Sequence, residues 1–189
     1  EYINAPYKAV LYERDGIIQE DHENEVSPID KVITACEHSN GPLLTIIEAA
    51  AGYGKTCTAY EIVNRLCLNH ADNIPLYIEL SRNREARIFK HVLQNEIELQ
   101  FQNIVTSEVV RHQIIEGRIP IVIDGFDELL SKDFSADSTE IRDVESMLNT
   151  ILDLLDGRSR IIITSRKTAI FSGEEFNALI DTKIRRYHI

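Results

Sequence analysis

Four short, mainly apolar runs divide the chain at intervals. They are Leu43–Ile47, Leu76–Leu80, Ile119–Ile123 and Arg160–Thr164, and helical patterns fill the stretches between them. A run without polar alternation predicts a strand that is buried on both faces. Strands that alternate with helices are joined by crossovers, and such strands run parallel. The sequence therefore predicts an α/β fold with three α/β/α layers, whose ligand should lie at the carboxyl ends of the strands.

The remaining elements follow from periodicity and from turn residues. Helices are expected over 29–38, from the loop that follows the first apolar run to about 70, and over 85–100, 107–116, 138–155 and 174–180. Short strands are expected over 7–12 and 183–187. Residues 1–40 are acidic, and we interpret them as a lead-in segment that could border an adenine through Tyr12 and Arg14. Residues 41–189 then form the core.

Composition and charge exclude some functions. With 189 residues, 43% hydrophobic and 27% charged, the chain is typical of one soluble globular domain. Its net charge of −11 argues against a protein that grips nucleic acid, because phosphate neutralisation dominates that affinity. No stretch reaches the roughly 18 apolar residues of a membrane span. The chain begins at Glu1, so we expect it to belong to a longer protein.

The three cysteines indicate a reducing, cytoplasmic setting. Cys36, Cys57 and Cys67 form no CxxC pair and have no histidine at zinc-ligand spacing. Cys57 and Cys67 are expected on one helix, roughly 15 Å apart, which is too far for a disulfide. We therefore expect small, buried, reduced side chains.

A glycine-containing loop follows the first apolar run. Ala49–Thr56 (AAAGYGKT) opens a helical stretch, which is the setting of a phosphate-binding loop of the form GxxxxGK[ST]. Its glycines let backbone N–H groups point at phosphate oxygens, and the helix start adds partial positive charge. We expect Lys55 to reach the β- and γ-phosphates and the Thr56 hydroxyl to bind Mg²⁺. The alternative is a small-residue turn ahead of a helix.

The nucleotide-binding residues expected from this loop are Ala51, Gly52, Tyr53, Gly54, Lys55, Thr56 and Cys57. Ala49 stands where the pattern has its first glycine. If that position needs a positive φ, alanine costs about 1–2 kcal/mol there. If it does not, the change is harmless.

Acidic residues follow the third run. Asp124 ends an apolar strand, and Asp127 and Glu128 come directly afterwards. A carboxylate at a strand end beside phosphates can hold Mg²⁺ through its water shell, so we expect Asp124 to be the metal ligand. Asp127 or Glu128 can orient and deprotonate an attacking water. Alternatively, the acids cap the next helix, and the two roles can coexist.

Polar residues also follow the fourth run, in the sequence IIITSR. If this strand lies between the first and third, Arg166 can approach the γ-phosphate, because its guanidinium fork suits phosphate oxygens. The alternative is a surface arginine after a strand.

Together, AAAGYGKT, IVIDGFDE and IIITSR resemble the Walker A, Walker B and sensor 1 motifs of NACHT-type STAND NTPases, over roughly residues 41–170. The DG-x-DE form resembles NACHT domains more than typical AAA+ proteins. The resemblance implies a mainly parallel five-stranded sheet of order 5-1-4-3-2, binding of ATP and ADP with Mg²⁺, and slow hydrolysis. It also implies nucleotide-controlled self-association in immune or antiviral defence, or in other signalling. Lys167 stands where such proteins often have proline.

Three functions remain open from the sequence. The first is an ATP-hydrolysing regulatory switch, which the acids at 127 and 128 favour. The second is a module that binds a nucleotide as a structural element. The third is a P-loop kinase of a small molecule, which would need an acceptor pocket and a basic lid; the one basic cluster is Arg82, Arg84, Arg87 and Lys90. A GTPase is disfavoured because the chain has no NKxD motif.

Overall fold

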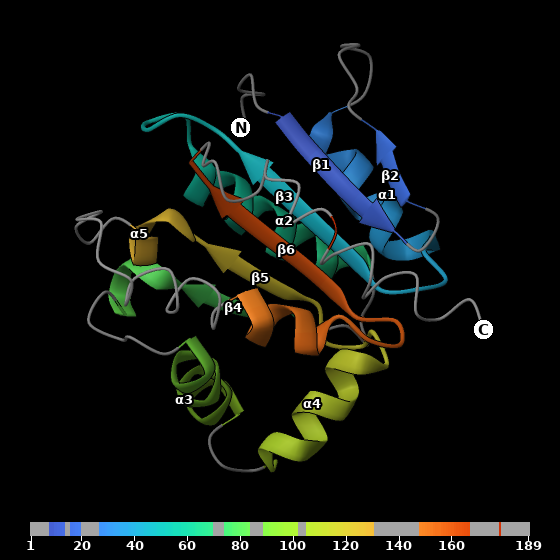
Figure 1. The fold of residues 1–189 in the computed structure, drawn as a ribbon, viewed down its shortest axis with the longest axis vertical. Helices are drawn as coiled ribbons and strands as arrows, with labels where there is room; N and C mark the ends of the chain where they lie inside the picture. The colour runs from blue at the N-terminus through green and yellow to red at the C-terminus, as the bar shows by residue number, and fades with distance from the viewer. Residues whose placement is uncertain are drawn as a thin grey trace.

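The computed structural model describes residues 8–13, 16–19, 27–69, 74–83, 89–101, 105–130, 148–166 and 178. Its strands are β1 (Lys8–Glu13), β2 (Gly16–Gln19), β3 (Leu43–Glu48), β4 (Leu76–Glu79), β5 (Ile121–Asp124) and β6 (Arg160–Ser165). Its helices are α1 (Pro28–His38), α2 (Lys55–Asn69), the 3₁₀ turn η1 (Leu80–Asn83), α3 (Phe89–Phe101), α4 (Ser107–Ile115) and α5 (Asp127–Leu130). Residues 148–154 are also helical. Figure 1 gives the arrangement.

The described strands form one sheet in the order β2-β1-β3-β6-β5-β4 (Figure 1). Strands β3, β6, β5 and β4 run parallel, as the alternation of strands and helices predicts. Strand β1 is antiparallel both to β3 and to β2. The chain is therefore an α/β protein with a parallel four-stranded core, extended at one edge by an antiparallel pair.

The expected strand count of five and the order 5-1-4-3-2 are wrong at this edge. The place beside β3 where a fifth core strand was expected is taken by β1. The pairing runs from Lys8↔Glu48 to Tyr12↔Leu44, and β6 pairs with the other side of β3. Both hydrogen-bonding edges of β3 are thus occupied, which leaves no place for a fifth parallel neighbour. The strand expected over 183–187 lies outside the described residues.

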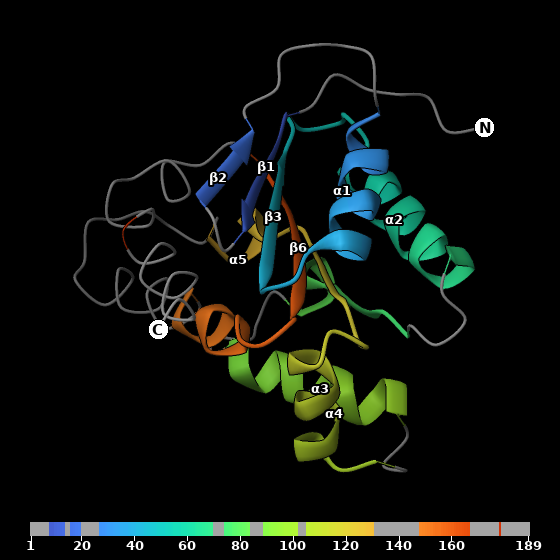
Figure 2. The ribbon, with the colours of Figure 1, turned by 90° about the vertical axis from the view of Figure 1, so that its right-hand side faces the viewer.

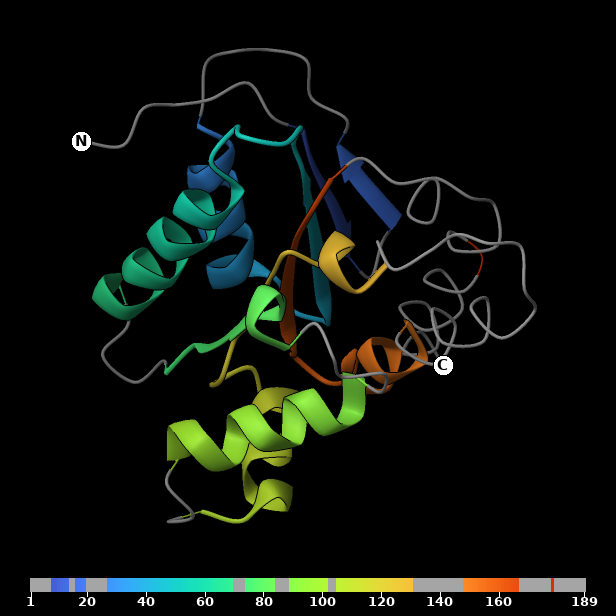
Figure 3. The same ribbon diagram turned by 90° about the vertical axis from the view of Figure 1, so that its left-hand side faces the viewer.

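Alternate residues of the parallel strands face two separate cores. On β6, Ile162 faces α1 and α2, whereas Ile161 and Ile163 face the opposite cluster. The first core consists of Ile29, Val32, Ile33, Ile47, Ala59, Ile62, Leu66, Val122 and Ile162. The second takes buried residues from α3, α4 and the helix over 148–154. Figures 2 and 3 show α1 and α2 together on one side of the strands, away from α3 and α4. This arrangement is compatible with three α/β/α layers and explains why the strands lack polar alternation.

Most described helices match their sequence patterns, with Pro28 in the first turn of α1. The cysteines do not match, because Cys57 and Cys67 are exposed and Cys36 is half-buried. Helix α2 turns Thr58, Ala59, Ile62 and Leu66 toward the sheet, so its cysteines lie on the other faces. No helix in the described ranges is long and apolar enough to cross a membrane. Of the helix expected over 138–155, only the part from 148 onward is described, and of the one over 174–180, only Ala178.

A buried arginine links the connection between α1 and β3 to β6, the last strand among the described residues. Arg160, at the start of β6, is 6% exposed. Its Nε donates to the carbonyl of Cys36 at 2.9 Å, and its two terminal nitrogens donate to Gly41 at 2.8 Å and Ser39 at 2.6 Å. A single guanidinium thus satisfies three carbonyls between the last turn of α1 and the start of β3, and it holds this connection against β6.

Replacing this side chain should destabilise the fold. We expect Arg160→Met to lower the free energy of unfolding by about 3 kcal/mol, because several charge-assisted hydrogen bonds are lost and buried carbonyls are left unpaired. Urea denaturation provides the measurement. Arg158→Met, which changes an exposed side chain nearby, is the control and should stay within about 0.5 kcal/mol of the parent. Equal stability of the two variants would contradict this role.

Candidate nucleotide site

The loop between β3 and α2 is shaped by two glycines. Gly52 and Gly54 have φ values of 81° and 80°, which favour glycine strongly. A Cβ on Gly52 would meet no atom within 4 Å, so the backbone conformation, and not crowding, requires this glycine. Helix α2 begins directly afterwards at Lys55, so the first N–H groups of α2 follow directly on the loop.

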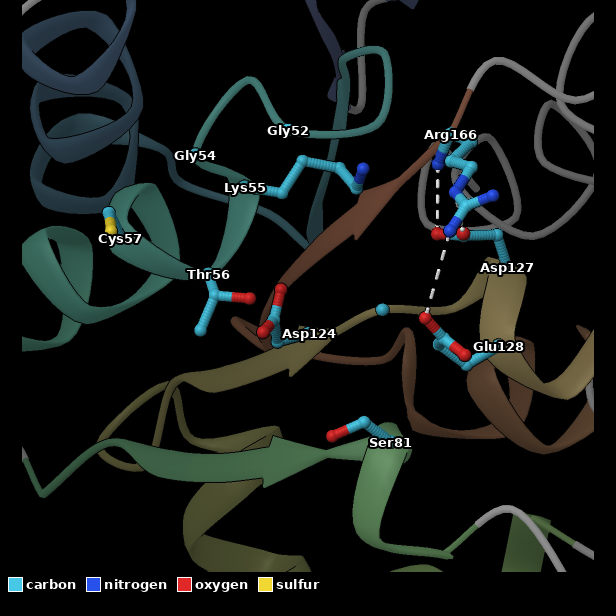
Figure 4. A pocket seen from close by; sticks show the side chains of 11 residues that line it. Gly52, Gly54, Lys55, Thr56, Cys57, Ser81, Asp124, Asp127, Glu128 and Arg166 are labelled. Atoms are coloured by element: carbon cyan, nitrogen blue, oxygen red, sulfur yellow. Dashed lines mark hydrogen bonds and ion pairs between the residues drawn. The ribbon is translucent and has the colours of Figure 1, made fainter.

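Lys55 folds back over this loop. Its Nζ donates to the carbonyls of Ala49 and Ala50, both at 3.3 Å. Figure 4 shows the ammonium group beside the end of β6. These are two neutral carbonyl partners at long distances. A phosphate oxygen would therefore be a stronger partner than either of them.

Ala49, which replaces the first glycine of the pattern, continues the sheet. Its backbone N–H donates to the carbonyl of Ser165 at 3.1 Å, which extends the pairing of β3 with β6 by one residue. Strand residues have a negative φ, which alanine adopts without cost. The sequence left the cost of this alanine open, and the hydrogen bond to β6 favours the alternative in which the change is harmless.

A cleft of about 320 Å³ opens where the loop faces the strand ends. Its lining residues are Gly52, Gly54, Lys55, Thr56, Cys57, Ser81, Asp124, Gly125, Asp127, Glu128 and Arg166 (Figure 4). Nine of these eleven were candidates from the sequence. Ala51 and Tyr53, also candidates, are exposed loop residues outside this lining. The sequence argument missed Gly125 and Ser81; the latter enters from η1 on the far side of β5.

Two hydroxyl groups hold the carboxylate of Asp124, which is 3% exposed. Thr164 on β6 donates to Oδ1 at 2.5 Å, and Tyr77 on β4 donates to Oδ2 at 3.3 Å. These strands flank β5, so each neighbour supplies one donor. Thr164 Oγ1 also accepts the N–H of Gly125 at 3.2 Å. Sequence reasoning assigned a role to neither hydroxyl; a tyrosine within the second apolar run was the available signal.

The Tyr77 hydroxyl keeps its proton at ordinary pH. Burial raises the pKa of this phenol well above its usual value, and the charge of Asp124 raises it further. Tyr77 therefore remains a hydrogen-bond donor toward Asp124.

The donor set at the cleft fits Mg²⁺. Thr56 directs its hydroxyl toward the Asp124 carboxylate (Figure 4). Mg²⁺ takes oxygen ligands, keeps several waters, and is usually bound by one or two carboxylates together with substrate phosphates. Across the described ranges, no three histidine, cysteine, aspartate or glutamate residues converge as a metal cage. The arrangement therefore suits a metal ion that arrives with phosphates better than one held by protein alone.

Arg166 is paired with the acidic residues of α5. Its Nε lies 2.9 Å from Asp127 Oδ2, and its backbone N–H donates to Asp127 Oδ1 at 2.9 Å. Its Nη2 lies 4.0 Å from Glu128 Oε1. Asp127 is 8% exposed, whereas the Arg166 side chain is 55% exposed. Both oxygens of Asp127 are thus engaged by one residue, and the guanidinium is directed at the acids (Figure 4).

The acidic residues at the start of α5 lie both in the first turn of a helix and at the cleft, the two placements that the sequence left open. Asp127 and Glu128 form the first turn of α5, where negative charge is favourable. They also line the cleft. Buried Phe126 anchors the turn that precedes them. Helix-start placement and cleft placement therefore coexist.

Other sequence candidates contribute little to the cleft. Arg82, from the basic cluster, is exposed and pairs with Glu79 at 2.7 Å. Arg84 and Arg87 lie outside the described residues, as do Arg14 and the side chains of Tyr12 and Lys90. No family model matches the sequence, and no curated protein matches it. The geometry of the cleft therefore carries the functional argument.

Asp127 and Glu128 should differ in their effect on stability. We expect Asp127→Asn to lower the free energy of unfolding by about 1 kcal/mol, because it removes the negative charge that pairs with Arg166. The effect is small because Asp127 is buried but the Arg166 guanidinium is exposed, so that solvent screens the ion pair. The isosteric Glu128→Gln is the matched variant and should stay within about 0.5 kcal/mol of the parent. Urea unfolding of both proteins measures the difference, and the reverse order would refute the assignment.

Proposed function

We propose that this chain is an Mg²⁺-dependent ATP-binding domain that hydrolyses ATP slowly and works as a nucleotide-controlled switch. The observation that carries the proposal is the position of Lys55 and the two positive-φ glycines at the start of α2, across the cleft from Asp124. A cationic loop with oriented N–H groups attracts phosphate, and an opposing carboxylate attracts its metal ion. The cleft would thus bring both halves of a Mg-triphosphate site together.

Each proposed contact follows from the chemistry of one group. Lys55 would leave its two carbonyl partners and bind the β- and γ-phosphate oxygens. Thr56 and Asp124 would hold Mg²⁺, which neutralises developing negative charge on the phosphates. The N–H groups of the loop, from Gly52 to Thr56, would surround the phosphate chain.

Glu128 is the better of the two candidates for orienting the attacking water. Asp127 already uses both oxygens on Arg166. Glu128 lines the cleft, and its Oε1 lies 4.0 Å from Arg166 Nη2, a longer separation than those between Arg166 and Asp127. General-base catalysis needs a carboxylate within reach of the attacking water, and in this cleft Glu128 would supply it. Arg166 would turn from the acids to a γ-phosphate when one is bound, since phosphate is also a bidentate partner.

The wider role rests on the motifs. The resemblance to NACHT-type STAND NTPases supports a domain whose nucleotide state controls self-association in a signalling or immune-defence protein. Such a protein would act in the cytoplasm. The net negative charge of the chain argues against a role in binding nucleic acid, whose phosphates are also negative.

A second candidate, binding of ATP without hydrolysis, is favoured by one observation. Arg166 lies against both acids of α5, and in that position it would neutralise the charge that a general base requires. A measurement of ATP hydrolysis separates the hydrolysing switch from the domain that only binds ATP.

Removing the loop cation should remove nucleotide binding. We expect Lys55→Ala to weaken Mg-ATP binding by at least about 100-fold, because a buried phosphate charge would lose its principal ionic partner. Isothermal titration calorimetry measures both proteins. Arg111→Ala, which removes an exposed cation on α4, is the control and should bind like the parent. Equal affinity of Lys55→Ala and the parent would refute the site.

ATP turnover by this chain alone should be slow. Within the described part, every lining residue comes from the loop, from α2, or from the strand ends with η1 and α5, so the bound nucleotide would be covered on one side only. We expect a rate below about 1 s⁻¹, since a covering arginine from elsewhere can add about 10³–10⁵ in rate. Phosphate release over a range of protein concentrations is the measurement, with Glu128→Gln as the inactive reference. A rate of about 1–100 s⁻¹ that is independent of concentration would show a site complete in one chain and contradict the switch.

A further inference from the structure

Tyr77 reaches Asp124 from the strand next to it. In the parallel register of β4 and β5, Glu79 lies opposite Asp124, and Tyr77 lies opposite Val122. Tyr77 is therefore two residues behind Asp124, on the same face of the sheet. Its long side chain spans this offset and places the hydroxyl 3.3 Å from Asp124 Oδ2.

We propose that Tyr77 is a positioning residue for the metal site, whose hydroxyl fixes the orientation of the Asp124 carboxylate. This inference rests on the proposed Mg-ATP site. The carboxylate of Asp124 can rotate about the bond to its side chain, and each of the two hydroxyls binds one of its two oxygens. The carboxylate is thereby held from both neighbouring strands before a metal ion arrives.

A purely packing role for Tyr77 would not need its hydroxyl. The ring packs against the core under α1 and α2, where a phenylalanine would fill the same space. Its neighbours on β4, Leu76 and Ile78, are fully buried and apolar. Tyr77 is the one residue of this strand with a side-chain hydrogen bond to Asp124, and it is the Asp124 end of that hydrogen bond that lines the cleft.

A second tyrosine connects this arrangement to the phosphate loop. The rings of Tyr60 and Tyr77 have centroids 4.9 Å apart, at an interplanar angle of 33°. Tyr60 lies four residues after Thr56, so it is on the same face of α2, one turn along. Helix α2 thus carries both the expected metal-binding hydroxyl and the ring that packs on Tyr77. The ring contact thus joins the helix that carries Thr56 to the strand whose tyrosine contacts Asp124.

Removing the Tyr77 hydroxyl should loosen the metal site and leave the phosphate loop intact. Changes to groups that orient a metal ligand typically cost about 10–100-fold in metal affinity. Tyr77→Phe keeps the ring, and therefore its packing on Tyr60. The loss should appear only in the part of ATP binding that depends on Mg²⁺.

The test measures the dissociation constant of a fluorescent ATP analogue twice, once in EDTA and once in saturating Mg²⁺. The ratio of the two constants is the gain in affinity that Mg²⁺ provides. We expect Tyr77→Phe to lower this ratio about tenfold and to leave the constant in EDTA unchanged. Thr45→Val is the matched control, because it removes a buried hydroxyl on β3 that has no hydrogen-bond partner among the described residues. Thr45→Val should keep the parent ratio, and circular dichroism checks that both variants fold.

The outcomes separate the inference from the function on which it rests. A parent protein that binds no ATP in either condition overturns the proposed function. A parent protein with a clear Mg²⁺ gain that Tyr77→Phe retains in full overturns the positioning role alone. Equal weakening of Tyr77→Phe in EDTA and in Mg²⁺ also overturns it, because that result indicates a general structural defect.

Discussion

The parallel run of β3, β6 and β5 is the constraint on which the site depends. Parallel neighbours end at the same edge of a sheet. The glycine loop after β3, Arg166 after β6 and Asp124 at the end of β5 therefore lie close together, although they are far apart in the sequence. The two cores hold this register, since a slip of one residue would turn each buried isoleucine of β6 to the wrong face. The chemistry at the edge is therefore a consequence of apolar packing in the middle of the sheet.

The two cationic side chains at this edge have partners that the phosphates of a bound nucleotide could replace. Lys55 donates to two backbone carbonyls, and Arg166 pairs with Asp127. Both cations thus have partners inside the chain, but their partners differ in strength: neutral carbonyls are weak, whereas a buried carboxylate is strong. Binding of phosphate should accordingly move Lys55 readily, and Arg166 only when a γ-phosphate competes with Asp127. A difference of this kind would let the site distinguish a triphosphate from a diphosphate.

Much of this arrangement could be predicted from the sequence, because apolar runs and turn glycines act locally. The parallel core could be predicted from four mainly apolar runs, and nine residues that line the cleft were candidates from the sequence. What depends on long-range pairing could not be predicted. The pairing of β1 with the edge of β3 is an example. The hairpin of β1 and β2 had a local signal, because the dipeptide Asp15-Gly16 favours a hairpin turn, but this signal does not say which strand the hairpin joins. The donors on Asp124 come from β4 and β6, and only the register of those strands brings Tyr77 and Thr164 to one carboxylate.

The central claim is that the loop binds phosphates and that Asp124 binds their metal ion, which backbone amide NMR tests directly. Titration with ATP in EDTA should shift the amides of Gly52–Thr56, and addition of Mg²⁺ should then shift those of Asp124 and Gly125. The opposite end of the sheet has a second hollow lined by Gly41, Gly157 and Arg158, among others. Shifts confined to that hollow, or no shifts at millimolar ATP, would contradict the account.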